Sequence, residues 1–131
     1  MKGSCLCGGV EYEVSMLDMP IIFCHCKTCQ KAHAAPFAPS AGVLRKNFRW
    51  LRGEDKISSF ESSPGKVRHF CSVCGTHLVA ERPHQLHVIL RVATLDEDPS
   101  LKPEAHIWTS HYKEWMEYEG IPSFAEWQSE R

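Results

Sequence analysis

Seven cysteines dominate the chemistry that this sequence can carry, and all of them lie in short clusters. The clusters have the patterns Cys5-x-Cys7, Cys24-x-Cys26-x-x-Cys29 and Cys71-x-x-Cys74. An odd number of cysteines cannot pair completely into disulfides within one chain. Where thiols stay reduced, clusters of this kind favour metal binding or catalysis over structural cross-links. The chain is therefore expected to bind metal through its cysteines.

The pattern Cys71-x-x-Cys74 is typical of a zinc knuckle, in which two thiolates bind one ion across a tight turn. Gly75 follows the second cysteine, where a chain reversal often needs a positive φ. A structural zinc site needs four tetrahedral ligands. Cys5 and Cys7 can supply the missing two, because residues i and i+2 of a strand share one face. The alternatives are unliganded cysteine pairs and a redox Cys-x-x-Cys motif, which usually starts a helix.

Three cysteines remain for a second site. Cys24 and Cys26 share a face of an extended segment, and Cys29 follows one helical turn later. Three protein ligands with an open fourth position are typical of a catalytic zinc. Three thiolates leave the ion with a net charge of about −1, so it is a poor Lewis acid. A soft thiol suits the fourth position better than water, which favours chemistry at carbon–sulfur bonds.

A second structural zinc is the alternative for this cluster, with His25, His33 or a distant residue as the fourth ligand. His33 is the best candidate, because it lies beyond Cys29 on the same short segment. His25 is also a candidate acid–base group, since the unperturbed pKa of histidine is near 6.5. An iron–sulfur cluster is a further alternative.

Short strands must position these clusters. Alternating or continuous apolar residues predict strands over 10–14, 21–23, 48–51, 57–60, 67–70, 76–80, 86–92 and 104–108. The strands 67–70 and 76–80 flank the knuckle and predict a hairpin with the metal at its tip. A short helix is expected from Cys26 to His33, ahead of two prolines, and a second over 112–118. The predicted class is mainly β.

The composition fits an ordinary globular domain. The 131 residues are 43% hydrophobic and 24% charged, which is enough for one core, so we expect a single domain over 1–131. Its ordered core should span about 3–119, with an irregular C-terminal tail held by Phe124 and Trp127. The net charge of −1 argues against nucleic acid or membrane partners. No signal-peptide-like start and no run of roughly 18 apolar residues is present, so a cytoplasmic location is expected.

Four segments carry a family resemblance. They are Gly3-Ser4-Cys5-Leu6-Cys7-Gly8-Gly9-Val10, Cys24-His25-Cys26-x-x-Cys29, Arg68-x-Phe70-Cys71-x-x-Cys74-Gly75-Thr76-x-Leu78, and His106-Ile107-Trp108 with the later Trp115 and Gly120-Ile121-Pro122. In this order they resemble the motifs of the glutathione-dependent formaldehyde-activating enzyme family, which includes centromere protein V. The match covers almost the whole chain.

The resemblance implies a fold, two metal ions and an activity. The fold would be an Mss4-like β-tent of short antiparallel strands with one or two short helices. Two zinc ions would be bound per chain, a structural one by Cys5, Cys7, Cys71 and Cys74, and a catalytic one by Cys24, Cys26 and Cys29. The implied function is a carbon–sulfur lyase acting on a thiol–aldehyde adduct of the glutathione and formaldehyde type, so its expected partner is a small-molecule thiol or such an adduct. A non-catalytic zinc module or scaffold is the alternative, because fold does not fix function.

Overall fold

A computed structural model describes residues 1–116 and 119–128 of the chain. Its strands are β1 (Lys2–Ser4), β2 (Glu11–Val14), β3 (Ile22–Cys24), β4 (Ala38–Leu44), β5 (Phe48–Arg52), β6 (Ile57–Ser63), β7 (Lys66–Cys71), β8 (His77–Glu81), β9 (His87–Arg91) and β10 (Ala105–Ile107). Within those residues the only α-helix is α1 (Lys27–His33). Short 3₁₀ turns are η1 (Arg45–Asn47), η2 (Glu54–Lys56), η3 (Val92–Thr94), η4 (Thr109–His111) and η5 (Glu114–Met116).

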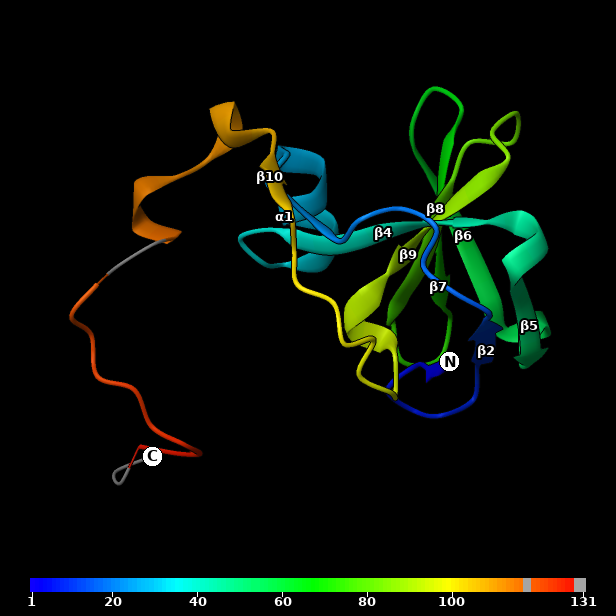
Figure 1. Cartoon of the computed structure of the whole chain (residues 1–131), viewed down its shortest axis with the longest axis horizontal. Helices are drawn as coiled ribbons and strands as arrows, with labels where there is room; N and C mark the ends of the chain where they lie inside the picture. The colour runs from blue at the N-terminus through cyan, green and yellow to red at the C-terminus, as the bar shows by residue number, and fades with distance from the viewer. Residues whose placement is uncertain (117–118, 129–131) are drawn as a thin grey trace.

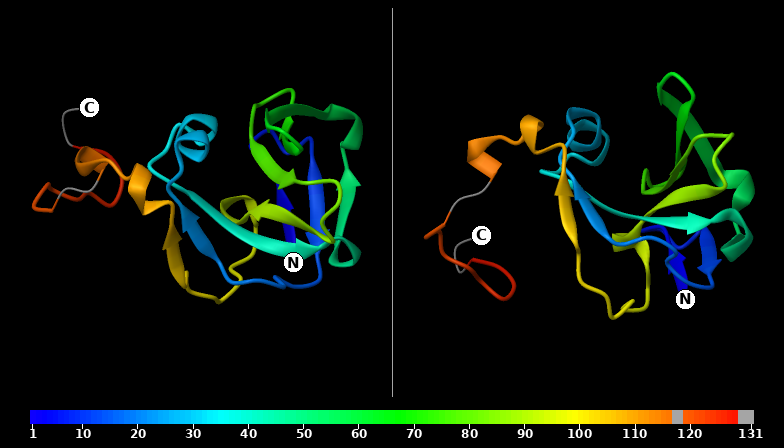
Figure 2. Two further views of the ribbon diagram at one scale, coloured as in Figure 1. Left: turned by 90° about the horizontal axis from the view of Figure 1, so that it is seen from above. Right: turned by 45° about the horizontal axis from the view of Figure 1, so that its top comes forward.

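The strands form two sheets (Figure 1). The small sheet has the order β1-β2-β5, and the large one has the order β10-β3-β4-β9-β8-β7-β6. Neighbouring strands are antiparallel except β10 and β3, which run parallel. Figure 2 shows β4 extending from the region of α1 to the small sheet, so this strand connects these two parts of the domain. The mainly β class and the short antiparallel strands of the Mss4-like fold are confirmed.

The hydrophobic core contains residues of the small sheet and of β4, β7, β8 and β9. Tyr12 is fully buried, stacks on Phe48 at 5.5 Å between ring centroids, and shares a 2.7 Å hydrogen bond between its hydroxyl and that of Thr94. Gly3 of β1 lies directly against the Tyr12 ring, where a Cβ atom would collide with it. Close packing of two strands therefore requires glycine at this position.

Two expectations for the secondary structure need correction. The strand β4 is absent from the predicted set, because Pro39 and Gly42 interrupt its apolar pattern and weaken the strand signal. The helix expected over 112–118 does not form over its described part. Tyr112 instead ends η4 and is followed by η5, whereas positions 117–118 lie outside the described residues.

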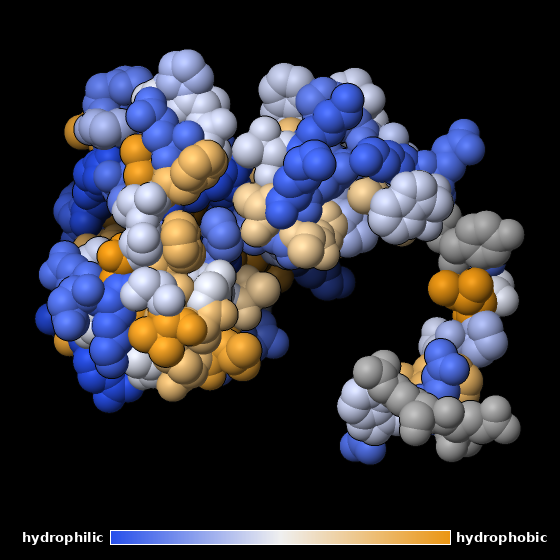
Figure 3. Space-filling model, turned by 180° about the vertical axis from the view of Figure 1, so that it is seen from behind, coloured by the Kyte–Doolittle hydropathy of each residue, from blue (hydrophilic) through white to orange (hydrophobic). Residues whose placement is uncertain are grey.

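The C-terminal segment stands away from the body of the domain (Figures 1 and 3). Its described part has an irregular backbone, as expected. Phe124 is 53% exposed and Trp127 is 67% exposed, so neither ring packs into the core as the sequence suggested. Within the described residues, no helix has the length and apolar character needed to cross a membrane.

Candidate metal centres

The first cysteine group joins the N-terminal segment to the β7–β8 hairpin. The Sγ atoms of its four members, Cys5, Cys7, Cys71 and Cys74, all lie within 4.8 Å of one another. The Sγ of Cys7 is 3.5 Å from that of Cys5 and 3.9 Å from that of Cys71. Four sulfurs at about 2.3 Å from a tetrahedral zinc would be about 3.8 Å apart. The spacing and the donor type therefore fit a four-coordinate zinc.

Two tight turns position these sulfurs. In the hairpin, the Cys71 amide donates to the Thr76 carbonyl at 2.9 Å, and Gly75 has φ = 80°, a backbone conformation that favours glycine. At the N-terminus, β1 ends at Ser4, so Cys5 and Cys7 lie in a turn and not on one face of a strand as expected. The turn brings both thiols to the same side nevertheless. The Leu6 amide then donates to Thr76 Oγ1 at 3.0 Å and joins the two turns.

The second group lies where β3 passes into α1. Cys24 is the last residue of β3, Cys26 caps α1, and Cys29 lies in the first turn of the helix. The Cys26 Sγ accepts a hydrogen bond of 3.3 Å from the Cys29 amide, which fixes the start of the helix around the cluster. The three Sγ atoms lie within 4.8 Å of one another. Among the described residues, no histidine, aspartate, glutamate or further cysteine joins this group.

The two candidate histidines lie outside the group of three sulfurs. His25 is buried, and its Nε2 is 2.8 Å from His106 Nδ1 on β10. The ring of His33 packs edge-on against His77, with 5.0 Å between their centroids. Burial lowers the pKa of His33 to about 3, and the charge of Arg91 acts in the same direction. His33 is therefore neutral at pH 7 and a weak base, which makes it a poor acid–base group there.

Two buried arginines surround the second group. Arg68 on β7 is 2% exposed and Arg91 on β9 is 5% exposed. The Arg68 Nη2 donates to Cys29 Sγ at 3.8 Å. A hydrogen bond from the Cys24 thiol lowers the pKa of Cys29 to about 4 against the effect of burial, and the charge of Arg91 and the hydrogen bond from Arg68 act in the same direction. Sequence reasoning missed both arginines, although Arg68 lies in the segment that leads into the Cys71 knuckle.

A cavity of about 560 Å³ opens between α1 and strands β6–β8. Arg68 and His77 form part of its wall, so it adjoins the surroundings of Cys29. Its other lining residues are Lys27, Thr28, Lys31, Ala32, Phe60, Ser62 and Phe70. None of these residues is acidic, and two lysines, the first and fifth residues of α1, line the cavity one helical turn apart. The cavity therefore suits an anionic molecule with an apolar portion.

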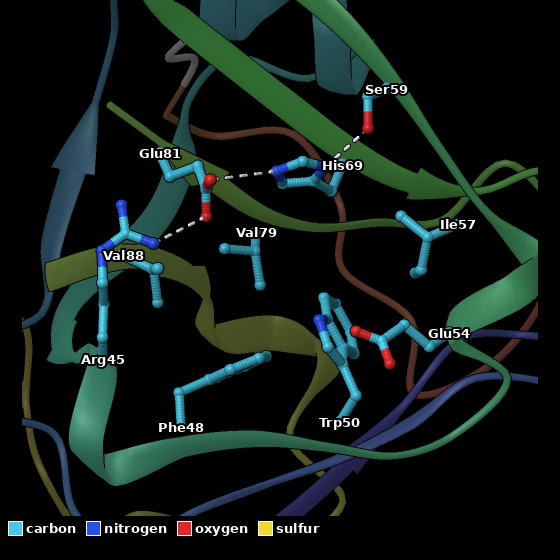
Figure 4. A pocket seen from close by; sticks show the side chains of 10 residues that line it. All are labelled: Arg45, Phe48, Trp50, Glu54, Ile57, Ser59, His69, Val79, Glu81 and Val88. Carbon is cyan, nitrogen blue, oxygen red and sulfur yellow. Dashed lines mark hydrogen bonds and ion pairs between the residues drawn. The ribbon is translucent and has the colours of Figure 1, made fainter. Parts of the chain in front are cut away.

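A different cavity, of about 440 Å³, is lined by residues from η1 to β9 (Figure 4). Its polar groups bond to one another: Ser59 Oγ lies 2.6 Å from His69 Nδ1, and His69 Nε2 lies 3.7 Å from Glu81 Oε1. Arg45 Nη1 is 3.2 Å from the other Glu81 oxygen. Figure 4 shows these side chains above the rings of Phe48 and Trp50, with no cysteine among the residues that line the cavity. This cavity is separate from both metal-ligand groups.

The fold and the two sulfur groups define a mainly β domain with two sites that can hold metal ions. The family model described as glutathione-dependent formaldehyde-activating enzyme matches residues 1–111, and the chain belongs to this family. A protein from Rhodobacter sphaeroides, whose crystal structure was solved as a structural genomics target, is similar in fold, with a TM-score of 0.63 and 26% identity. The match covers 81% of this chain and 98% of that one.

Proposed function

We propose that the protein is a zinc-dependent carbon–sulfur lyase that acts on adducts of a small thiol with an aldehyde. The observation that carries this proposal is the contrast between the two sulfur groups. One has the four donors that a closed structural site needs, and the other has three, as in catalytic sites with an open position. The family assignment supports the same reaction class.

The reaction of such an adduct is simple to balance. The carbon–sulfur bond of an S-hydroxymethyl thiol breaks, the hydroxyl proton passes to solvent, and the sulfur keeps the bonding electron pair, so that a thiolate and formaldehyde result. Zinc held by Cys24, Cys26 and Cys29 would supply a fourth position in which the thiol stays deprotonated near neutral pH. The same balance in reverse describes formation of the adduct.

The chain's own residues would bind and orient the substrate. The cavity beside α1 is large enough for a small thiol, and its apolar walls, Phe60 and Phe70, would exclude water from part of it. Lys27 and Lys31 would attract a carboxylate-bearing thiol such as glutathione to this cavity. Arg68 would stabilise negative charge on the sulfur side, because it already donates to Cys29.

The test is turnover by fully zinc-loaded protein. S-hydroxymethyl adducts of glutathione and of smaller thiols would be followed by exchange NMR, with the Cys29→Ser protein as the control. We expect wild-type protein to accelerate exchange and Cys29→Ser to leave it at the uncatalysed rate. Two zinc ions per chain with no acceleration for any adduct would overturn the proposal in favour of a non-catalytic zinc module.

A further inference from the structure

Two permanent positive charges are buried at the second cysteine group without a carboxylate to balance them. Arg68 and Arg91 are 2% and 5% exposed. Among the described residues, neither guanidinium forms an ion pair with aspartate or glutamate. Their side-chain partners there are the hydroxyls of Ser62 and Ser40 and the Cys29 sulfur. Serine hydroxyls carry no charge, so the compensating charge must lie elsewhere.

The sulfurs of the second cysteine group can supply the negative charge that compensates the two arginines. A buried charge is costly unless it is paired and hydrogen-bonded. Arg68 Nη2 lies 3.8 Å from Cys29 Sγ, and Arg91 interacts electrostatically with all three cysteines of the group. Lys66, which is half-buried on the same strand as Arg68, also interacts electrostatically with Cys26 and Cys29. The arginines and the sulfurs therefore form one electrostatic unit.

A charge count for this unit indicates what the fourth position takes. Three thiolates and one Zn²⁺ sum to about −1, whereas the two guanidinium groups sum to about +2 because arginine stays protonated. A neutral fourth ligand such as imidazole would leave an uncompensated positive charge in a buried place. An anionic ligand would bring the total for the sulfurs, the ion and the two arginines to about zero, which is the arrangement that burial favours. Lys66 is left out of this count because it is only half-buried, so solvent screens its charge.

Two donors are also available for such a ligand. Arg68 Nη1 and Arg91 Nη2 are buried, and neither has a hydrogen-bond partner among the described residues. Buried N–H groups normally have a partner, so a ligand that accepts hydrogen bonds would satisfy them. Arg68 also lines the cavity beside α1, through which a small molecule would reach the group.

We propose that Arg68 and Arg91 are positioning residues that make the fourth position of the second metal site selective for an anion, such as a thiolate, over a neutral ligand. The proposal rests on the proposed function only in requiring a metal ion at this site. It adds what the family assignment does not state, namely which residues set the charge of the ligand.

The test is ligand binding to cobalt-loaded protein, read from the visible absorption of Co²⁺. Thiocyanate serves as a permanent anion, 2-mercaptoethanol as a thiol and imidazole as a neutral ligand. Wild-type protein should bind the first two more tightly than imidazole. Arg68→Met and Arg91→Met should each weaken binding of thiocyanate and of the thiol about tenfold or more, because one nearby charge shifts such equilibria by that much. Imidazole binding should change little.

Matched variants control for packing. Arg68→Lys keeps the charge and should keep anion affinity within a few-fold, and Arg49→Met removes an exposed arginine that pairs with Glu13. If the methionine variants do not fold, the relative affinity of wild-type protein for the anions and for imidazole still tests the inference.

Imidazole binding as tightly as the anions, or methionine variants with wild-type anion affinity, would overturn the inference. Anion selectivity without lyase turnover would refute the proposed function and leave this inference standing, and one cobalt per chain would refute both.

Discussion

His25 Nε2 lies 2.8 Å from His106 Nδ1, so a hydrogen bond joins two imidazoles that are 81 positions apart in the sequence. The bond joins the segment between β3 and α1 to β10. The backbone bond from the His25 amide to the Ile107 carbonyl, at 2.9 Å, strengthens the same connection. The pair therefore has a structural role beside the second cysteine group, since His25 Nε2 already has this partner.

His106→Ala should lower the free energy of unfolding by about 1 kcal/mol, the usual net value of one hydrogen bond. Zinc content should stay at two ions per chain, because neither histidine belongs to a sulfur group. Chemical denaturation and metal analysis measure the two quantities. His84→Ala, at an exposed histidine, is the control. Loss of one zinc in His106→Ala would show that this pair supports a metal ligand.

Cys71→Ser should unfold the domain. Structural zinc sites contribute apparent binding energies of about 10–16 kcal/mol, which is as large as the whole stability of a small domain. Circular dichroism and zinc analysis of the purified variant check this. A folded Cys71→Ser protein with one zinc would show that the group of four is not the structural site.

Cys29→Ser should fold, retain one zinc ion per chain and lose thiol-dependent turnover by more than about 100-fold. The variant should still fold because this group spans one local segment, whereas the other group joins segments that are distant in the sequence. Thermal melting, metal analysis and the adduct assay are the measurements. If Cys29→Ser fails to fold, the structural and catalytic assignments of the two groups are reversed.

Stability should depend on pH through His33. Its folded pKa is about 3, below the unfolded value of 6.5, so the unfolded chain binds the proton first. The contribution of neutral His33 is complete above pH 6.5 and is lost as the pH falls toward 3. In the upper part of this window, before acid releases metal, wild-type protein should lose roughly 0.5 kcal/mol more than His33→Asn between pH 6.5 and 5.5, which is about half of the full linkage value because His33 is partly exposed. Denaturation at pH 5.5 and 6.5 measures the difference, and equal slopes would contradict it.

Gly3→Ala should destabilise the protein by about 1–3 kcal/mol, because the new methyl group would overlap the buried Tyr12 ring. The ring has no room to move, since Phe48 stacks on it and Thr94 holds its hydroxyl. Urea denaturation measures the loss, with the exposed Ser72→Ala as control. Wild-type stability in Gly3→Ala would mean that β1 can shift away from the core.

Local signals made part of this molecule predictable. The knuckle hairpin combines two β-rich segments with Cys71, Cys74 and Gly75 at the turn, and each of these features is visible in the sequence. The same holds for the second group, where Cys24 ends a strand and Cys29 follows in a short helix. In both places the separation of the cysteines along the chain determines how close their sulfurs lie, so the sequence pattern is enough to predict the local arrangement.

Features that depend on distant contacts were not predictable. Pro39 and Gly42 obscure β4, which is held by pairing with β3 and β9 on either side. Arg68 and Arg91 are residue types that are usually exposed, and their burial follows from strand order, which local patterns do not encode. The turn that holds Cys5 likewise depends on the hairpin beside it.

As the chain is synthesised, the cysteines of the two sulfur groups become available at different times. All three sulfurs of the second group lie within one short segment, so they can meet as soon as that segment leaves the ribosome. Cys7 must wait for Cys71, 64 positions later, which takes roughly 3–13 s at about 5–20 residues per second. During that interval the three sulfurs of the second group are already present in the nascent chain, whereas the first group still lacks Cys71 and Cys74. The sulfurs that could hold a metal ion are therefore all present earlier in the second group than in the first.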